Sequence, residues 1–268
     1  MHREVDLHGK VPPDVQPDEL KTWILFENLD LLVINKPGWL VCHPSKRGPL
    51  SSLIGAARLH TGADTLHLVA RLDRETSGVV VLAKNRVAAR KYQMAIEHRR
   101  VRKTYVAVLQ GELTSAARVD QPIGKCTNSA VYSKMGALDT GDRKNAVSIF
   151  TPLDSRNGYT ICSVEIETGR RHQIRVHAQW LGHSIVGDKL YGPDENLFLE
   201  FIEHGWTKLH DAALPIERQA LHCFRYAFDF EGEGEAKEYI APVPNDMRDL
   251  CREKMETELV EFEFQIKS

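Results

Sequence analysis

Two apolar runs separated by a short polar segment constrain the fold of this chain more than any other feature. The runs are Leu68–Leu72 and Val79–Leu82, and the segment between them, residues 73–78, reads DRETSG. Short apolar runs bounded by turn residues are typical of buried strands, so we expect a strand, a tight loop and a second strand. Asp73 then stands where a strand gives way to a loop. Such a position suits a reacting group, because the scaffold fixes it while the loop admits substrate.

The same residues have a purely structural interpretation. Asp, Ser and Thr side chains bond the backbone of turns, and Gly78 supplies a positive φ angle. On the residues alone, a structural turn is favoured over a catalytic loop.

Several motifs in order resemble the RluA-type pseudouridine synthases. The stretch ARLDRETSGVVVLAKN, residues 70–85, is similar to that family's signature, approximately HRLDxxTSGxxxxAK, which contains the nucleophilic aspartate. NKPG precedes it, and VRKTYVAVLQG, GRRHQIRVHAQWLGHSIVGDKLYG and RQALHC follow it in the family's order. The resemblance extends from about Leu31 to Phe230. One departure is Ala70, where the family usually has His, and it affects local packing or RNA contact rather than the chemistry.

The resemblance implies an isomerase that converts specific uridines of ribosomal RNA or tRNA into pseudouridine. A carboxylate suits this reaction, because it attacks or stabilises a sugar centre that develops positive charge. By the resemblance Asp73 is the nucleophile, Tyr105 the ring that stacks the flipped base and accepts a proton, and Arg175 the partner of the nucleophile. Arg71 takes the place that the flipped base leaves. We expect the remaining substrate-binding residues to be Arg74, Lys103, Arg171, His172 and Gln173.

Two other classes of function stay open. A nucleosidase or glycosidase also uses an aspartate, typically with a partnered acidic residue, and the motifs contain no second carboxylate in such a role. A catalytically silent RNA-binding protein of the same fold would have lost Asp73, Tyr105 or Arg175, and this chain has all three.

A metal site is the competing interpretation of the third motif, because His172, His177, His183 and Asp188 lie close in sequence. Zinc-binding histidines on a helix normally sit four residues apart with a glutamate between them, whereas His172 and His177 are five apart. We therefore expect no metal and no cofactor. The chain has 5 cysteines without a Cys-x-x-Cys pair, which indicates reduced, mainly structural thiols.

Composition restricts the partners. The chain has 268 residues, 42% hydrophobic and 27% charged, which is ordinary for a globular protein, and its net charge is −2. RNA binding must therefore depend on local basic clusters, such as those in segments 86–91, 98–103 and 170–171. No stretch reads as a signal peptide or a membrane span. We expect a cytoplasmic monomer that binds a stem-loop of ribosomal RNA or tRNA.

Organisation along the chain predicts the fold class. Residues 1–18 read as a loosely ordered leader, followed by one catalytic domain, 19–268, without a separate N-terminal RNA-binding module. Ser51-Ser52 and Asn85 are suited to capping helices, and further helices are expected near 172–181, 193–204 and 245–257. Asn157-Gly158 predicts a hairpin, while segment 111–144 predicts hairpins and a mobile, substrate-facing loop. Irregularly interspersed helices favour an α+β fold with a largely antiparallel sheet. The resemblance implies that this central sheet is bent, is flanked by helices and has the active-site cleft along it.

Overall fold

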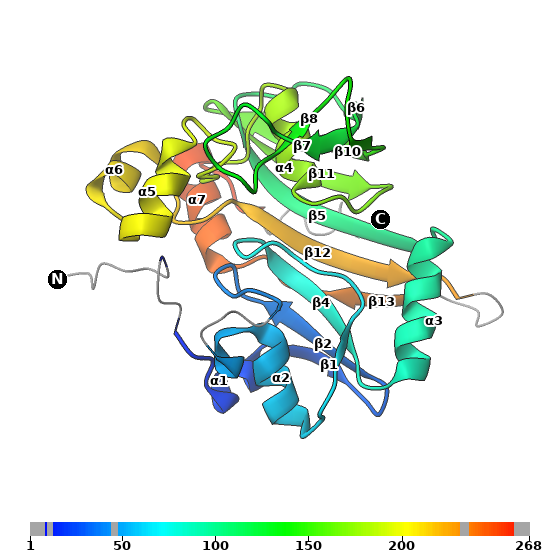
Figure 1. The fold of residues 1–268 in the computed structure, drawn as a ribbon. Helices are drawn as coiled ribbons and strands as arrows, with labels where there is room; N and C mark the ends of the chain where they lie inside the picture. The colour runs from blue at the N-terminus through cyan, green and yellow to red at the C-terminus, as the bar shows by residue number, and fades with distance from the viewer. Residues whose placement is uncertain (1–8, 10–12, 44–47, 231–235, 260–268) are drawn as a thin grey trace. The chain divides into compact units, whose positions relative to one another are not determined.

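The structure is a computed structural model that describes residues 9, 13–43, 48–230 and 236–259 (Figure 1). The chain divides into two compact units. Residues 13–103 and 222–242 form the unit that we call the Asp73 unit, and residues 104–221 and 243–259 form the Arg175 unit. Most of the expected leader lies outside the described residues. The expectation of one catalytic domain after it stays a prediction.

The Asp73 unit is built on a mixed sheet. Its strands are β1 (Ile24–Glu27), β2 (Leu31–Lys36), β3 (His67–Leu68), β4 (Ser77–Ala83), β12 (Leu221–Phe228) and β13 (Lys237–Ile240). The order is β1, β2, β4, β12, with β3 beside β4 and β13 beside β12. All these pairs are antiparallel except β4 with β12, which run parallel. Every residue of β4 is buried, so this strand is covered on both faces.

Local sequence signals set the helices of this unit, which are α1 (Pro17–Thr22), α2 (Leu53–Thr61) and α3 (Arg86–Glu97). The Ser52 hydroxyl accepts a hydrogen bond from the Gly55 N–H at 3.3 Å, and the Asn85 side chain accepts one from the Ala88 N–H at 2.9 Å. Both predicted N-caps are therefore confirmed. Helix α1 begins at Pro17, inside the segment expected to be a loose leader, because proline is favoured in a first helical turn.

The Arg175 unit contains an antiparallel sheet and a small three-stranded sheet. The larger sheet has the order β5 (Val101–Gln110, of which residues from Thr104 on belong to this unit), β11 (Tyr159–Ile166), β10 (Val147–Arg156) and β6 (Ala117–Asp120). The smaller has the order β8 (Met135–Ala137), β7 (Ile123–Lys125) and β9 (Arg143–Lys144). Asn157 and Gly158 have φ angles of 54° and 75° and join β10 to β11, so the predicted two-residue hairpin is confirmed.

Strands β6 to β9 lie in segment 111–144, and β7 pairs antiparallel with β8 and with β9, which confirms the hairpins predicted there; the mobility of this segment stays a prediction. The helices of this unit are α4 (Gln173–Trp180), α5 (Asn196–His204), α6 (Lys208–Ala213) and α7 (Asn245–Met255). Helix α5 starts three residues after the predicted Pro193, and α6 was not predicted. None of the described helices is long and apolar enough to cross a membrane. The α+β class with a largely antiparallel sheet is confirmed, whereas the bent sheet and the cleft stay predictions.

Candidate active site

The loop that carries Asp73 leaves the sheet earlier than the sequence predicted. Strand β3 ends at Leu68, and the last ladder bond is from the Val69 N–H to the Val81 carbonyl, at 3.0 Å. The expected strand Leu68–Leu72 is therefore wrong, because Leu72 turns to pack against the apolar core of this unit. The Thr76 N–H closes a turn on the Asp73 carbonyl at 3.2 Å, and the Asp73 side chain is half-buried.

Lys36 fixes this loop through three hydrogen bonds. Its side chain is 0% exposed, and Nζ donates to the carbonyl oxygens of Pro37 at 2.8 Å, Leu40 at 2.8 Å and Arg74 at 2.9 Å. Arg74 Nε in turn donates to the Trp39 carbonyl at 3.3 Å. A buried ammonium group with three acceptors ties the NKPG turn to the residue that follows Asp73. The structure thus gives Arg74 a positioning contact, and its expected binding of substrate stays a prediction.

The residues after the loop anchor it to β12. Ser77 Oγ lies 2.9 Å from His222 Nδ1, and His222 Nε2 donates to the Ala241 carbonyl at 3.0 Å, so Nδ1 accepts from the serine hydroxyl. Gly78 has a φ angle of 111°, and a Cβ atom there would lie 2.2 Å from the Cys223 carbonyl oxygen. The Ser-Gly pair of the first motif and the His-Cys pair of the last therefore meet in the β4–β12 pairing.

Two basic side chains of the Asp73 unit lie on its surface near the loop. Arg71 is exposed, and its expected entry into the RNA stays a prediction. His43 is also exposed, and partial burial together with the charge of Arg71 lowers its pKa. His43 lies outside the recognised motifs, so sequence reasoning had no signal for it. Its neutral form offers a hydrogen-bonding group beside a permanent cation.

Strand β5 carries two of the expected site residues. Tyr105 is opposite Val164 of β11 and is 7% exposed. The Lys103 ammonium lies 4.9 Å from the centroid of the Tyr226 ring, and burial lowers the pKa of this lysine. Burial also raises the pKa of Tyr226 well above its usual value. Both expected residues are thus held by rigid sheet structure rather than by a loop.

Arg175 forms a buried ion pair with Asp188. Its Nε and Nη2 donate to the two oxygens of the Asp188 carboxylate at 2.6 Å and 2.9 Å, and the two side chains are 9% and 0% exposed. Burial by itself would raise the pKa of Asp188, but the Arg175 charge and hydrogen bonds, together with the N–H groups of Tyr191 and Leu190, lower it. Asp188 is therefore ionised at neutral pH. The expected pairing of Arg175 with Asp73 stays a prediction.

Gln173 serves the framework of α4. It is 3% exposed, its Oε1 accepts from Thr168 Oγ1 at 2.7 Å, and its Nε2 donates to the Val147 carbonyl at 2.8 Å and to Ser148 Oγ at 3.0 Å. These bonds use both ends of the amide, so the structure supports anchoring of the helix to β10. A contact of Gln173 with substrate stays a prediction.

His172 and Arg171 precede the helix. His172 has a φ angle of 57°, and its Nδ1 lies 2.9 Å from the hydroxyl of Tyr191, which also accepts from the Met135 N–H at 2.8 Å. The hydrogen bond between His172 Nδ1 and the tyrosine hydroxyl fixes the orientation of the imidazole ring. Arg171 is exposed. Among the described residues no group of three His, Cys, Asp or Glu side chains is placed to hold a metal ion.

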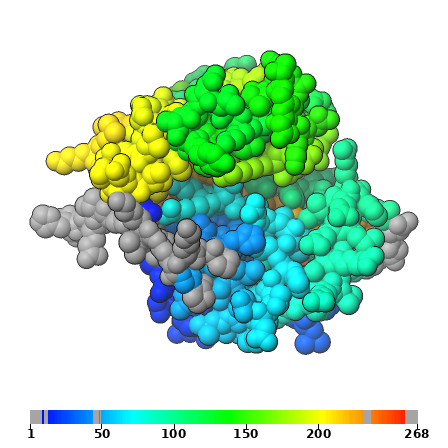
Figure 2. Space-filling view, in the orientation of Figure 1, coloured from blue at the N-terminus to red at the C-terminus, as the bar shows by residue number. Residues whose placement is uncertain are grey.

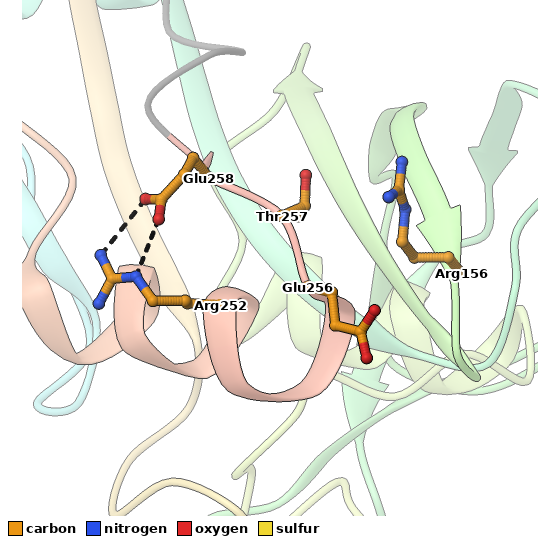
Figure 3. Close-up of a pocket in the computed structure, with 5 residues that line it drawn as sticks. All are labelled: Arg156, Arg252, Glu256, Thr257 and Glu258. Carbon is orange, nitrogen blue, oxygen red and sulfur yellow. Dashed lines mark hydrogen bonds and ion pairs between the residues drawn. The ribbon is translucent and has the colours of Figure 1, made fainter.

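A polar cavity of about 450 Å³ lies elsewhere in the Arg175 unit (Figure 3). It is lined by Arg156 at the end of β10 and by Arg252, Glu256, Thr257 and Glu258 around the end of α7. Arg252 Nε pairs with Glu258 at 2.9 Å. The cavity contains none of the residues expected to bind substrate, and its lining of two arginines and two glutamates has no net charge.

Residues 30–180 match the family model described as RNA pseudouridylate synthase, and this stretch is more than half of the 268 residues. The chain belongs to that family. It is 35% identical over 230 residues to ribosomal large subunit pseudouridine synthase D of Vibrio parahaemolyticus, which covers 84% of this chain and 68% of the relative. An uncharacterised RNA pseudouridine synthase of Mycoplasma pneumoniae is 37% identical over 188 residues, 70% of this chain. The chain spans 60% of the length of that Mycoplasma relative.

Solved structures agree with this assignment. Human RNA pseudouridylate synthase domain containing 4 has a TM-score of 0.69 and 25% identity, and the match covers 91% of this chain and 96% of the human one. Human RNA pseudouridylate synthase domain containing 1, at 24% identity, shares the fold with a TM-score of 0.65, over 85% of this chain and 86% of that one.

Sequence reasoning missed the contacts of three residues that hold expected site residues, or the segments next to them, in place within their own units. Lys36 and His222 lie in recognised motifs, NKPG and RQALHC, but their contacts with Arg74 and Ser77 span 38 and 145 positions of the chain. Asp188 was considered only as a metal ligand. The sequence did contain a signal for the ion pair: Asp188, in GDKLYG, follows closely after the expected helix that carries Arg175.

Proposed function

We propose that this protein is an RNA pseudouridine synthase that uses Asp73 as its nucleophile. The observation that carries the proposal is the placement of Asp73, in the family's motif, on a loop that the buried Lys36 ammonium fixes through the Arg74 carbonyl at 2.9 Å. Catalytic groups need such support, because a displacement of about 1 Å is enough to lower a rate strongly.

The reaction breaks the bond between N1 of uracil and C1′ of ribose, forms a bond between C5 and C1′, and moves the C5 proton to N1. It involves no net oxidation, so it calls for no redox cofactor. The Asp73 carboxylate attacks or stabilises the electron-poor centre. Tyr105 stacks the extruded base and handles the proton, Arg175 holds the nucleophile ionised, and the exposed Arg71 fills the gap in the RNA.

The substrate that we propose is a stem-loop of ribosomal RNA or tRNA. The name of the Vibrio relative, a ribosomal large subunit pseudouridine synthase, supports the ribosomal choice. Exposed basic residues such as Arg71 and Arg171 supply local positive charge in a chain whose net charge is −2. We propose further that the protein acts as a monomer in the cytoplasm. An absolute requirement for an assembled ribosomal particle would contradict the choice of a stem-loop.

The deciding experiment is incubation with uridine-containing stem-loops of both RNAs. Isomerisation leaves the mass of the RNA unchanged and yields pseudouridine, hydrolysis releases uracil, and binding alone does neither. Asp73→Asn should fold and bind RNA but make no pseudouridine, because asparagine keeps the size and removes the anion. Asp64→Asn, at an exposed aspartate of the same unit, is the matched control and should keep wild-type activity. Substantial turnover by pure Asp73→Asn protein would end the assignment.

A further inference from the structure

Tyr132 presents an aromatic ring on the surface of the Arg175 unit. Its side chain is 83% exposed on the loop between β7 and β8, whereas the preceding Val131 is 4% exposed and packs in the core of the unit. The green segments around this loop form part of the surface seen in Figure 2. Single exposed apolar residues are common, so exposure alone assigns nothing. Two further observations support a binding role for Tyr132: its loop is anchored, and a cation lies against its ring.

Glu195 holds the loop in place. Its carboxylate accepts from Ser129 Oγ at 2.7 Å, from Lys134 Nζ at 2.8 Å and from the Ala130 N–H at 3.1 Å. The hydrogen bond from Lys134, followed by that from Ser129, lowers the pKa of Glu195 to about 2. The Lys134 N–H also closes a turn on the Val131 carbonyl at 2.9 Å. The ring of Tyr132 is thus displayed on an ordered turn, which reduces the entropy lost when a ligand binds.

A cation covers one face of this ring. Lys125 Nζ lies 3.4 Å from the ring centroid, in cation–π contact. An aromatic ring has two faces, and the 83% exposure of the side chain leaves the other available to solvent. Arg143 and Lys144 form β9, which pairs with β7, and both are exposed.

We propose that Tyr132 is a stacking platform for an unpaired RNA base outside the uridine that is modified. A planar ring with a cation on one face, in a loop that follows a strand paired with the basic strand β9, suits a nucleotide, because the base stacks on the ring while the basic groups of this small sheet attract its phosphates. The inference rests on the proposed function for its choice of RNA. It adds a contact that selects substrates with an unpaired nucleotide besides the modified uridine.

The test compares the binding of two fluorescein-labelled RNAs, a hairpin with an unpaired loop and a blunt duplex of the same length. Tyr132→Ala should weaken binding of the hairpin on the order of 10-fold to 100-fold and leave duplex binding unchanged, because loss of one stacked base has that effect. Tyr132→Phe should stay close to wild type. Lys125→Ala should reduce the slope of log Kd against log salt by about one, whereas Tyr132→Ala should not change it.

Trp180→Ala, at a side chain that is 53% exposed in the same unit, is the matched control and should bind both RNAs as wild type does. The proposal would be overturned if Tyr132→Ala and Trp180→Ala lost the same affinity for the hairpin, or if Tyr132→Ala lost none. A protein partner would then be the alternative ligand for this surface. The proposed function fails separately: a wild-type protein that makes no pseudouridine but binds the hairpin through Tyr132 would refute that function and support the platform.

Discussion

Arg175 holds Asp188 by two parallel hydrogen bonds, from Nε to Oδ2 at 2.6 Å and from Nη2 to Oδ1 at 2.9 Å, with the carboxylate fully buried. A guanidinium has five N–H donors in a rigid plane, and the ion pair with Asp188 uses the edge formed by Nε and Nη2. Asp188 also accepts from the N–H groups of Leu190 and Tyr191 at 2.9 Å and 3.0 Å. The arginine is thus oriented by a carboxylate that is itself fixed by the backbone, which gives its guanidinium one orientation.

The first prediction concerns removal of this cation. Arg175→Met leaves Asp188 buried without its partner and should lower the free energy of unfolding by about 3–5 kcal/mol at neutral pH. In the wild type the pKa of Asp188 is lowered, so the stability that it contributes is present above its unfolded pKa and is lost as pH falls through the folded value. In the variant burial raises that pKa, so its contribution is lost as pH rises.

The difference in stability between wild type and Arg175→Met should therefore shrink between pH values of about 7 and about 5. Urea unfolding of both proteins at the two pH values measures it. Arg118→Met removes a guanidinium that is paired with Asp120 on the surface of the same unit, and it should have a small effect at both pH values. A deficit of Arg175→Met that does not change with pH would show that Asp188 stays ionised without its partner.

The second prediction concerns Lys36. Lys36→Met has a similar length but leaves three carbonyl oxygens without their buried donor, which should lower the free energy of unfolding by at least about 3 kcal/mol. The Asp73 loop loses its anchor, so kcat should fall more than KM rises. Lys84→Met, at a lysine that pairs with Glu27 near the surface, is the control and should change stability by less. A normal kcat in folded Lys36→Met protein would contradict the prediction, because it would show that the Lys36 contacts with the loop are not needed for catalysis.

Caps and turns could be predicted from the sequence, because each depends on contacts within a few residues. Ser52, Asn85 and the Asn157-Gly158 turn were predicted correctly for that reason. The contacts of Lys36 with Arg74 and of Ser77 with His222 span 38 and 145 positions of the chain. No periodicity or propensity reports such contacts. The motif resemblance indicated which segments matter but not which atoms join them.

The third prediction compares two glycines with positive φ angles. At Gly78 a Cβ atom would lie 2.2 Å from the Cys223 carbonyl oxygen, and the backbone cannot move without breaking the β4–β12 pairing. Gly78→Ala should therefore give little folded protein. Gly62 ends α2 with a φ angle of 66°, and a Cβ atom there would meet no atom outside the adjoining residues within 4 Å, so Gly62→Ala should cost about 1–2 kcal/mol. Soluble yield and thermal melting measure both, and equal effects would contradict the close approach.

The fourth prediction separates the ring of Tyr105 from its hydroxyl. Tyr105→Phe keeps the stacking surface, so RNA binding should remain nearly normal, while turnover should fall on the order of 100-fold because the proton-handling group is gone. Tyr159→Phe, at a half-buried tyrosine of β11, is the matched control and should have wild-type activity. Binding that falls as far as turnover would make the hydroxyl a recognition group instead.

The last prediction concerns His177, which is 0% exposed between Ser148 Oγ at 2.9 Å from Nδ1 and the Gln121 carbonyl at 3.0 Å from Nε2. Burial lowers its pKa, although the Gln121 carbonyl and the charge of Asp120 oppose this. As pH falls through about 6.5, His177 therefore becomes protonated in the unfolded chain but stays neutral in the folded protein. The free energy of unfolding then decreases as pH falls below about 6.5 toward the pKa of the folded protein.

His177→Gln should remove this dependence, because a glutamine amide donates to one oxygen and accepts from the other without titrating. The free energy of unfolding of the variant should fall less than that of the wild type between pH values of about 7.5 and about 5. His204→Gln removes an exposed histidine of α5 and should follow the wild-type curve. Parallel curves for wild type and His177→Gln would mean that the folded protein accommodates a charged His177, with Ser148 Oγ turning to accept a hydrogen bond from the protonated ring.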